Sequence, residues 1–155
     1  MLSPLTVQDI VEVMRIERLP GYDAYIGAWE AEAHAAEMAS PAARYLGWRE
    51  GGGLAGFTIF QKFLDPVVRL RRIAVAQPGC GTGTVLLRAA IDWLFDAAPA
   101  QAVDLHVRPE NHRARTVYER EGFLEGPPDH PEADVMILSR ARWAGLPRRD
   151  GRNSQ

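Results

Sequence analysis

The sequence predicts an α/β (α+β) domain in which a mixed, mostly antiparallel sheet of about six or seven strands carries about four helices on its two faces. Segments typical of strands at 44–49, 54–62 and 67–76 are joined by turns too short for a crossover, so they form an antiparallel meander. A glycine-rich loop and a long amphipathic helix then lead to a strand at 102–107, which is the order of a parallel βαβ unit. One more helix and two short strands complete the domain.

The N-terminal part is predicted to hold an edge strand at 2–7 and two helices. Thr6 is placed to cap a helix of about ten residues that begins near Gln8. A second helix, rich in alanine and glutamate, is expected at 25–39, after a break at Leu19-Pro-Gly21. The buried face of the first helix is expected to carry Ile10, Val11, Val13, Met14 and Ile16.

After the glycines, the pattern predicts two helices and three strands. The strand at 102–107 alternates cleanly, and the helix at 111–121 ends at Gly122, a residue typical of the position after a helix. Strands at 123–125 and 134–139 flank a proline-rich loop. The helix that follows the glycines is expected to bury a stripe made of Val85, Leu86, Ala89, Ala90, Trp93 and Leu94.

Composition limits the class of protein. The 155 residues are 46% hydrophobic and 25% charged, which is ordinary for one soluble domain, expected at 1–146. The polar, basic residues 147–155 are expected to be a disordered tail. A formal net charge of −2 gives no reason to expect nucleic acid or a membrane as a partner, and basic clusters such as Arg113 with Arg115 are typical of solvated faces. A single cysteine excludes an intramolecular disulfide and a multi-cysteine zinc site. No metal is expected, and the protein is expected to be cytoplasmic.

The strand at 67–76 has a break in its alternation. Leu70 lies three positions before Ile73, whereas one face of a strand repeats every two. A β-bulge near Arg71 or Arg72 would return Leu70 to the core face; a half-exposed strand with imperfect patterning explains the periodicity equally well. Because a bulge leaves backbone polar groups unpaired directly before the glycines, the position favours a ligand that lies along the strand.

Gly79, Gly81 and Gly83 alternate between this strand and the long helix. Without a Cβ they let backbone N–H groups approach an anion closely, and the helix N-terminus adds the positive end of a dipole. The loop therefore predicts a pyrophosphate-binding site. Because the same spacing also occurs in ordinary tight turns, the loop alone does not identify the ligand.

Two stretches together resemble the GCN5-related N-acetyltransferase (GNAT) superfamily. Leu70-Arg-Arg-Ile-Ala-Val75, followed by Pro78-Gly-Cys-Gly-Thr-Gly83, is similar to its motif A. Asn111-His-Arg-Ala-Arg-Thr-Val-Tyr-Glu-Arg-Glu-Gly-Phe123 is similar to its motif B, N-x-x-A-x-x-x-Y-x-x-x-G-F. The order of the elements matches the family from about Leu2 to Leu138, and this implies a GNAT fold.

The chain departs from the family at one position. Pro78 stands where the family usually has Gln or Arg, and Gln77 lies one residue early. Because the loop binds mainly through backbone amides, cofactor binding is still expected. The resemblance implies acetyl-CoA as the acyl donor, held by Ile73, Ala74, Val75, Gly79, Cys80, Gly81, Thr82, Gly83, Thr84, Asn111, Ala114, Arg115 and Tyr118. Asn111 is also a candidate helix N-cap, and Arg115 a candidate for a solvated helix face.

Transfer of an acetyl group to an amine needs a neutral amine, a donor to the carbonyl oxygen and a proton for the leaving thiolate. The resemblance assigns Tyr118 as the general acid. His106 is the candidate base: it lies five residues before Asn111, where relatives that acetylate protein N-termini often have a carboxylate, and histidine ordinarily titrates near neutral pH. A satisfied or surface histidine, a water chain and a substrate that arrives deprotonated are the alternatives. Weaker candidates for the base are Glu17, Tyr22, Glu30 and His34.

Other polar residues near these motifs are given simpler roles. Cys80 is interpreted as a loop residue and not a nucleophile, since no histidine or aspartate is placed beside it. Arg69 and Arg71 are either partners for a carboxylate or phosphate of the acceptor or solvated strand charges. Trp29, Tyr45 and Trp48 are expected in the core.

The resemblance thus implies direct acetyl transfer to the primary amine of a small-molecule or amino-acid-like acceptor. The alternatives are a protein N-terminal or lysine acetyltransferase and a non-catalytic acyl-CoA sensor of the same fold. A Rossmann-type nucleotide-binding protein is disfavoured by the antiparallel meander and by the lack of an acidic residue at the end of the next strand. Dimers are common in the family, so a homodimer is possible.

Overall fold

The computed structural model describes residues 1–20 and 29–147. Its centre is one seven-stranded sheet in the order β1-β2-β3-β4-β5-β7-β6. Only the β4–β5 pair is parallel, which confirms the predicted meander and βαβ unit. The strands are β1 (Leu2–Pro4), β2 (Arg44–Glu50), β3 (Gly53–Gln61), β4 (Val67–Val75), β5 (Ala102–Val107), β6 (Leu124–Glu125) and β7 (Asp134–Ser139).

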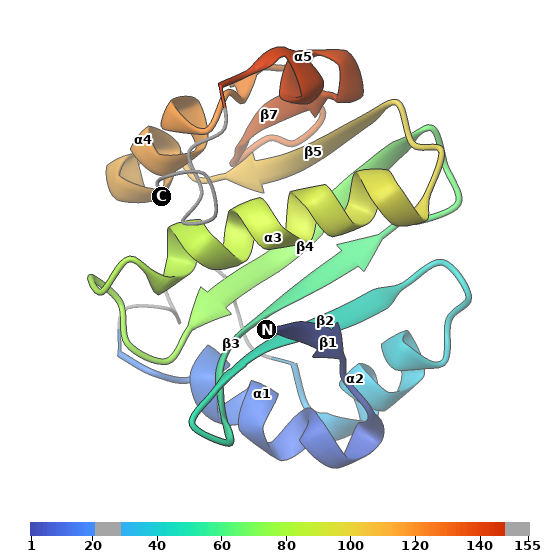
Figure 1. Cartoon of the computed structure of the whole chain (residues 1–155), viewed down its shortest axis with the longest axis vertical. Helices are drawn as coiled ribbons and strands as arrows, with labels where there is room; N and C mark the ends of the chain where they lie inside the picture. The colour runs from blue at the N-terminus through green and yellow to red at the C-terminus, as the bar shows by residue number, and fades with distance from the viewer. Residues whose placement is uncertain (21–28, 148–155) are drawn as a thin grey trace.

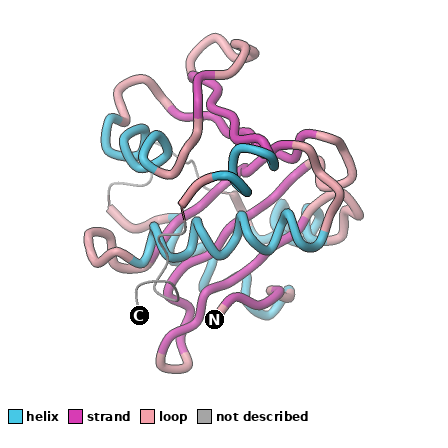
Figure 2. Tube along the Cα trace, turned by 45° about the horizontal axis from the view of Figure 1, so that its top comes forward, coloured by secondary structure: helices cyan, strands magenta, loops and turns pink. Residues whose placement is uncertain are grey.

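Five α-helices accompany the described part of the sheet: α1 (Ile10–Glu17), α2 (Ala31–Met38), α3 (Thr82–Ala97), α4 (His112–Arg120) and α5 (Arg140–Gly145). The long helix α3 crosses the strands, whereas α4 and α5 lie at the β5–β7 end (Figures 1 and 2). The prediction did not include α5, which begins where the Ser139 side chain accepts a hydrogen bond from the Arg142 amide. No described helix is long and apolar enough to cross a membrane.

The N-terminal helix begins as predicted. Thr6 accepts a hydrogen bond from Gln8, and Asp9 accepts one from the Thr6 amide, so the two form a capping box on a short 3₁₀ turn, Val7–Asp9, that leads into α1. Part of the second predicted helix, 25–28, lies outside the described residues, and α2 occupies 31–38 of the remainder. The predicted tail also lies outside them, apart from Pro147.

Two hydrophobic clusters pack on the opposite faces of the sheet. The first lies under α3 and includes Phe60, Leu70, Val103 and Leu105; the second lies under α1 and includes Val13, Ile16 and Phe57. The prediction for Val11 is wrong, because its side chain is 76% exposed. Glu17 takes part in the buried face of α1 instead.

The buried stripe of α3 is also displaced from the predicted one. It is formed by Leu86, Leu87, Ala90, Ile91, Leu94 and Phe95. Val85 is exposed, and Ala89 and Trp93 are only half-buried, so the predicted stripe is wrong at these three positions. Apolar residues occupy neighbouring columns of this helix, and only packing against β3 and β4 decides which column is buried.

The predicted bulge in β4 is present. Ile59 pairs with Arg72 and Phe60 pairs with Leu70, which leaves Arg71 as the extra residue. Leu70 and Ile73 then pack against the same cluster under α3, as the break in alternation required. The bulge turns Arg72 to the α1 side, where it lies beside Glu17.

Candidate functional site

The ladder between β4 and β5 ends early. Its last pair is Arg69 with Asp104, although β4 continues to Val75 and β5 to Val107. The two strands start side by side and their ends lie apart (Figure 1). The opening begins directly before the bulge at Arg71, so the predicted ligand-binding strand segment, Ile73–Val75, lies along one side of it.

The glycine loop follows the open end of β4. Gly79 and Gly81 have φ angles of 88° and 83°, a conformation that favours glycine. Gly81 is the N-cap of α3, and a Cβ there would meet nothing within 4 Å. Gly83, in contrast, lies inside α3. The first-turn amides of this sixteen-residue helix, which include those of Thr82 and Thr84, have no carbonyl partner within the helix, so they are the donors that the predicted pyrophosphate site needs.

Two more residues lie at this loop. The exposed Cys80 contacts the side-chain oxygen of Gln77 through its sulfur. A Cβ on Gly79 would lie 3.6 Å from Nη2 of Arg113, which comes from the first turn of α4. Arg113 was not predicted at this loop, because a contact with a residue more than thirty positions earlier leaves no periodic signal in the sequence. It brings a cation to a loop in which Pro78 supplies none.

Helix α4 stands beside the opening. Asn111 caps it by accepting a hydrogen bond from the Ala114 amide at 3.3 Å, which confirms its predicted N-cap role. Ala114 and Tyr118 are partly buried and pack against the cluster under α3, as Ile73 of β4 does. The Tyr118 ring lies 5.6 Å from that of Phe123. Their contacts with a cofactor stay predictions.

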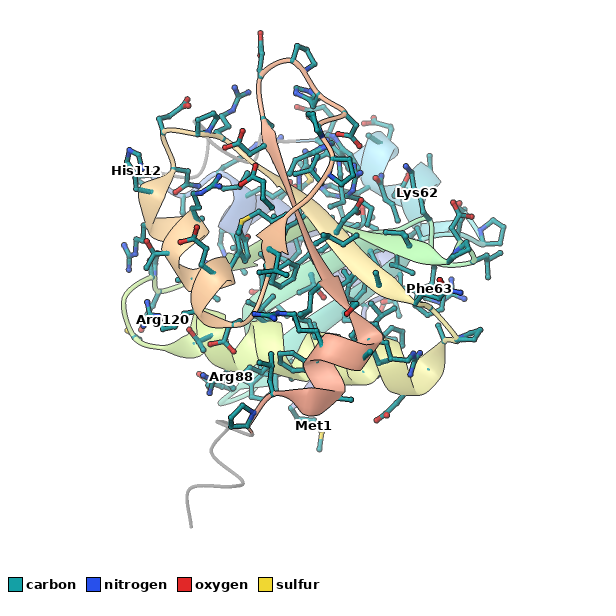
Figure 3. All side chains as sticks on the ribbon, turned by 90° about the horizontal axis from the view of Figure 1, so that it is seen from above. Met1, Lys62, Phe63, Arg88, His112 and Arg120 are labelled. Atoms are coloured by element: carbon teal, nitrogen blue, oxygen red, sulfur yellow. The ribbon has the colours of Figure 1, made fainter. Side chains whose placement is uncertain are left out.

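Helix α4 is fixed at its other end by ion pairs. Arg88 of α3 donates two hydrogen bonds, at 2.7 and 3.0 Å, to the buried Glu121. Figure 3 shows Arg88 and the end of α4 at Arg120 near one another.

Arg115 pairs with carboxylates of α4, β6 and β7, which are Glu119, Glu125 and Asp134. Its hydrogen bond to Glu125 raises the pKa of Arg115. A contact of Arg115 with the cofactor stays a prediction. Such a contact requires Arg115 to break one or more of these three ion pairs.

His106 lies on the other side of the opening, in a group of charges. Its Nε2 lies 2.6 Å from Oδ1 of Asp129, and its Nδ1 lies 3.4 Å from Nη1 of Arg69. Since a guanidinium only donates, Nδ1 accepts and Nε2 carries the proton that Asp129 accepts. The hydrogen bond from His106, together with the charge of Arg69, lowers the pKa of Asp129. The ring is oriented like the histidine of a catalytic dyad, but it can take a proton at Nδ1 only if Arg69 moves.

Arg69 itself is not a solvated charge. It is 8% exposed and donates to both oxygens of Asp104, at 2.6 and 3.2 Å, and to Asp129 at 3.2 Å. The hydrogen bond to Asp104 raises the pKa of Arg69. This interpretation of Arg69 as a solvated charge is therefore wrong, because carboxylates of β5 and of the β6–β7 loop surround the guanidinium.

A second buried network lies on the α1 side of the sheet. Glu17 and His34 are fully buried, and His34 lies 2.8 Å from Glu17 and 2.6 Å from the hydroxyl of Tyr45. Arg72 donates to the other Glu17 oxygen at 2.9 Å and stacks on Trp29. Burial raises the pKa of Tyr45 above its ordinary value. The fold thus brings Glu17 and His34, two weaker candidates for the base, together. Both are buried, so neither faces solvent.

The remaining candidates have other positions. Tyr22 lies outside the described residues. Glu30 forms an ion pair with Arg18 at 3.2 Å, and its side chain is 79% exposed. The expected core position is confirmed for Tyr45, whereas Trp29 and Trp48 are half-buried.

Comparisons with known proteins point to one family. The model of the acetyltransferase (GNAT) family matches residues 10–123. No curated protein sequence matches the chain. Among solved structures, the chain is similar to the spermidine N-acetyltransferase from Vibrio cholerae in complex with CoA and spermine, with a TM-score of 0.78 and 19% identity over 94% of this chain and 98% of that one.

Two further structures are similar. The ribosomal-protein-S18-alanine N-acetyltransferase from Escherichia coli has a TM-score of 0.70 and 24% identity over 88% of this chain and 90% of that one. The PaiA N-acetyltransferase from Thermoplasma acidophilum in complex with coenzyme A has a TM-score of 0.75 and 16% identity, with 90% and 98% covered. At these identities the likeness concerns the fold.

Proposed function

The chain belongs to the GNAT family of acetyltransferases, and on that premise we propose that it transfers the acetyl group of acetyl-CoA directly to the primary amine of a small-molecule or amino-acid-like acceptor. The family makes it an N-acetyltransferase with acetyl-CoA as acyl donor. The observation that carries the proposal is the opening of β4 from β5 between the bulge and the glycine loop. We place the reaction in the cytoplasm, where the exposed thiol of Cys80 stays reduced.

In this proposal the backbone of Ile73–Val75 binds the arm of the donor that carries the thioester, and the amides of Gly79–Thr84 bind its pyrophosphate. The acceptor nitrogen attacks the thioester carbonyl carbon, the C–S bond breaks, and the sulfur takes a proton from the Tyr118 hydroxyl. The new amide nitrogen gives up its extra proton to a base. The fold supports this assignment of Tyr118, which packs against the same cluster as Ile73.

The assay follows from the donor. At about a hundredfold excess over Kd, acetyl-CoA or CoA is expected to stabilise the protein by about 2.7 kcal/mol, which raises Tm by roughly 5–10 °C for a domain of this size. Stabilisation by NAD or ATP but not by CoA would contradict the proposal. Release of free thiol over a panel of amines then identifies the acceptor class. Binding without release with any amine indicates a sensor, and release only with peptides indicates a protein acetyltransferase.

The role of His106 as the base is tested by the pH dependence of the rate. If the ring takes the proton, kcat/KM of the wild type falls as the pH is lowered, because the protonated ring cannot accept. In His106→Ala this acidic limb is lost and kcat falls by about 10²-fold or more. The control is His130→Ala, since the His130 ring lies 5.2 Å from that of His106 and its side chain is exposed. An unchanged pH profile in His106→Ala would rule out this base.

Arg113 is expected to strengthen binding of the donor phosphates. Arg113→Gln weakens CoA binding about tenfold, because a charge-assisted hydrogen bond to a phosphate is lost. The loss is smaller at high salt, since the guanidinium is exposed. Isothermal titration of CoA at two salt concentrations measures it, with Arg15→Gln on the distant helix α1 as the control. An equal Kd in both variants would show that Arg113 does not contact the donor.

A further inference from the structure

Strand β4 carries three arginines at the opening, and the fold neutralises two of them. Arg69 is bound by Asp104 and Asp129, and Arg72 is bound by the buried Glu17. Within the described residues, Arg71 has no carboxylate within ion-pair distance. Two carboxylates act on it only through their charge: that of Glu37, which accepts a hydrogen bond from Gln61 at 3.0 Å, and that of Glu17, which Arg72 and His34 bind.

The bulge decides where Arg71 lies. As the extra residue of β4, it comes two positions after the last pair of the β4–β5 ladder. Its guanidinium lies 5.3 Å from the centre of the Trp29 ring, and that of Arg72 lies 4.1 Å from the same ring. Trp29 thus supports both side chains on the α1 side of the sheet, and Arg71 is the one that remains exposed.

A supported, exposed guanidinium without a carboxylate partner is free to pair with an anion from outside the protein. A guanidinium binds a planar carboxylate or a phosphate through two parallel hydrogen bonds, and of the two the carboxylate is the group that an amino-acid-like acceptor carries. A polycation such as a polyamine would instead be repelled by the positive charge of Arg71 at the same place. Two carboxylates that could attract such a polycation, those of Asp104 and Glu17, are bound by Arg69 and Arg72.

We propose that Arg71 binds a carboxylate of the acceptor, so that the substrate is an amine that also carries a carboxylate, as a free amino acid does. This inference rests on the proposed function, because it places the anionic end of the acceptor beside the opening where its amine attacks. It makes Arg71 a specificity-determining residue and separates the acceptor class from the polyamines.

The test compares amines that differ only in this charge. Free amino acids are matched with their amides, and spermidine and O-phosphoethanolamine are added. The wild type is expected to prefer the amino acid over its amide by at least tenfold in kcat/KM. In Arg71→Gln the KM for the amino acid rises about 10- to 100-fold, kcat changes little, and the preference disappears. Arg71→Lys is intermediate, and Arg15→Gln behaves as the wild type.

Other outcomes overturn the inference. They are a wild type that prefers the amide or spermidine, a wild type that uses O-phosphoethanolamine in preference to every amino acid, and an equal rise of KM for acid and amide in Arg71→Gln. A binding measurement separates this inference from the proposed function: the amino acid and its amide are titrated into CoA-saturated protein. If no amine is acetylated but the amino acid binds the wild type and not Arg71→Gln, the Arg71 site stands and the enzymatic function fails. If acetylation occurs but the amino acid binds the wild type and Arg71→Gln equally well, the enzymatic function stands and the Arg71 site fails.

Discussion

Replacement of Tyr118 by phenylalanine is expected to lower kcat by about 10²- to 10⁴-fold, the usual contribution of a general acid, while the Kd of acetyl-CoA changes little. Phenylalanine keeps the ring against Phe123 and against the cluster under α3, so the change removes only the hydroxyl. Stopped assays at saturating acetyl-CoA give kcat, and isothermal titration gives the Kd. The loss appears in kcat because the proton goes to the sulfur only as the C–S bond breaks.

Tyr45→Phe is the matched control for this experiment, since it is the same chemical change in the buried network. It removes a hydrogen bond of 2.6 Å to His34 and is expected to cost about 1–2 kcal/mol of stability with little effect on kcat. Unchanged turnover in Tyr118→Phe would remove Tyr118 from the acid role. A fall in kcat of the same size in Tyr45→Phe would show that a loss of packing, and not of a proton donor, explains both.

Replacement of Glu17 by alanine is expected to lower the free energy of unfolding by about 3–5 kcal/mol, and Tm by roughly 6–20 °C. The carboxylate is fully buried, and its removal leaves the Arg72 guanidinium without its buried partner and His34 without its partner on Nε2. An uncompensated buried charge is among the most destabilising changes known for a single residue. Urea unfolding at equal protein concentration measures the difference.

Glu30→Ala provides the comparison, because it breaks an ion pair of 3.2 Å whose acidic side chain is 79% exposed. This change is expected to cost no more than about 1 kcal/mol. A double variant, Glu17→Ala with Arg72→Met, is expected to be more stable than Glu17→Ala alone, because it no longer buries the Arg72 charge in the absence of the Glu17 carboxylate. Equal losses for Glu17→Ala and Glu30→Ala would contradict the role assigned to the network.

Local patterns in the sequence were sufficient for most of the sheet. The turns between 44 and 76 are short, so they allow only antiparallel neighbours, and the clean alternation of 102–107 matches β5 residue for residue. The bulge was visible for the same reason, since a face that repeats every two residues exposes one extra residue as a phase error. Gly79 and Gly81 were recognisable because their φ angles favour glycine.

The same patterns failed where neighbouring residues of a helix were equally apolar, or where a side chain's partner lies far away in the sequence. Val85 and Leu87 both suit the buried side of α3, and packing on the sheet selected Leu87. Arg115 was expected at the cofactor or in solvent, and three carboxylates from α4, β6 and β7 surround it. Arg113 gave no signal, because nothing local connects the start of α4 with Gly79.

The sequence by itself determined the family and the glycine loop, because both depend on residue types at fixed short spacings, and it offered the bulge in β4 as one of two explanations of the broken alternation. Only the tertiary structure decided which charged side chains form ion pairs within the fold. Glu17 meets His34 across 17 positions and Arg72 across 55, while Arg71, one residue from Arg72, is left exposed at the opening. Such partners are chosen by burial and by distance in space, and neither is encoded in the spacing of residues along the chain.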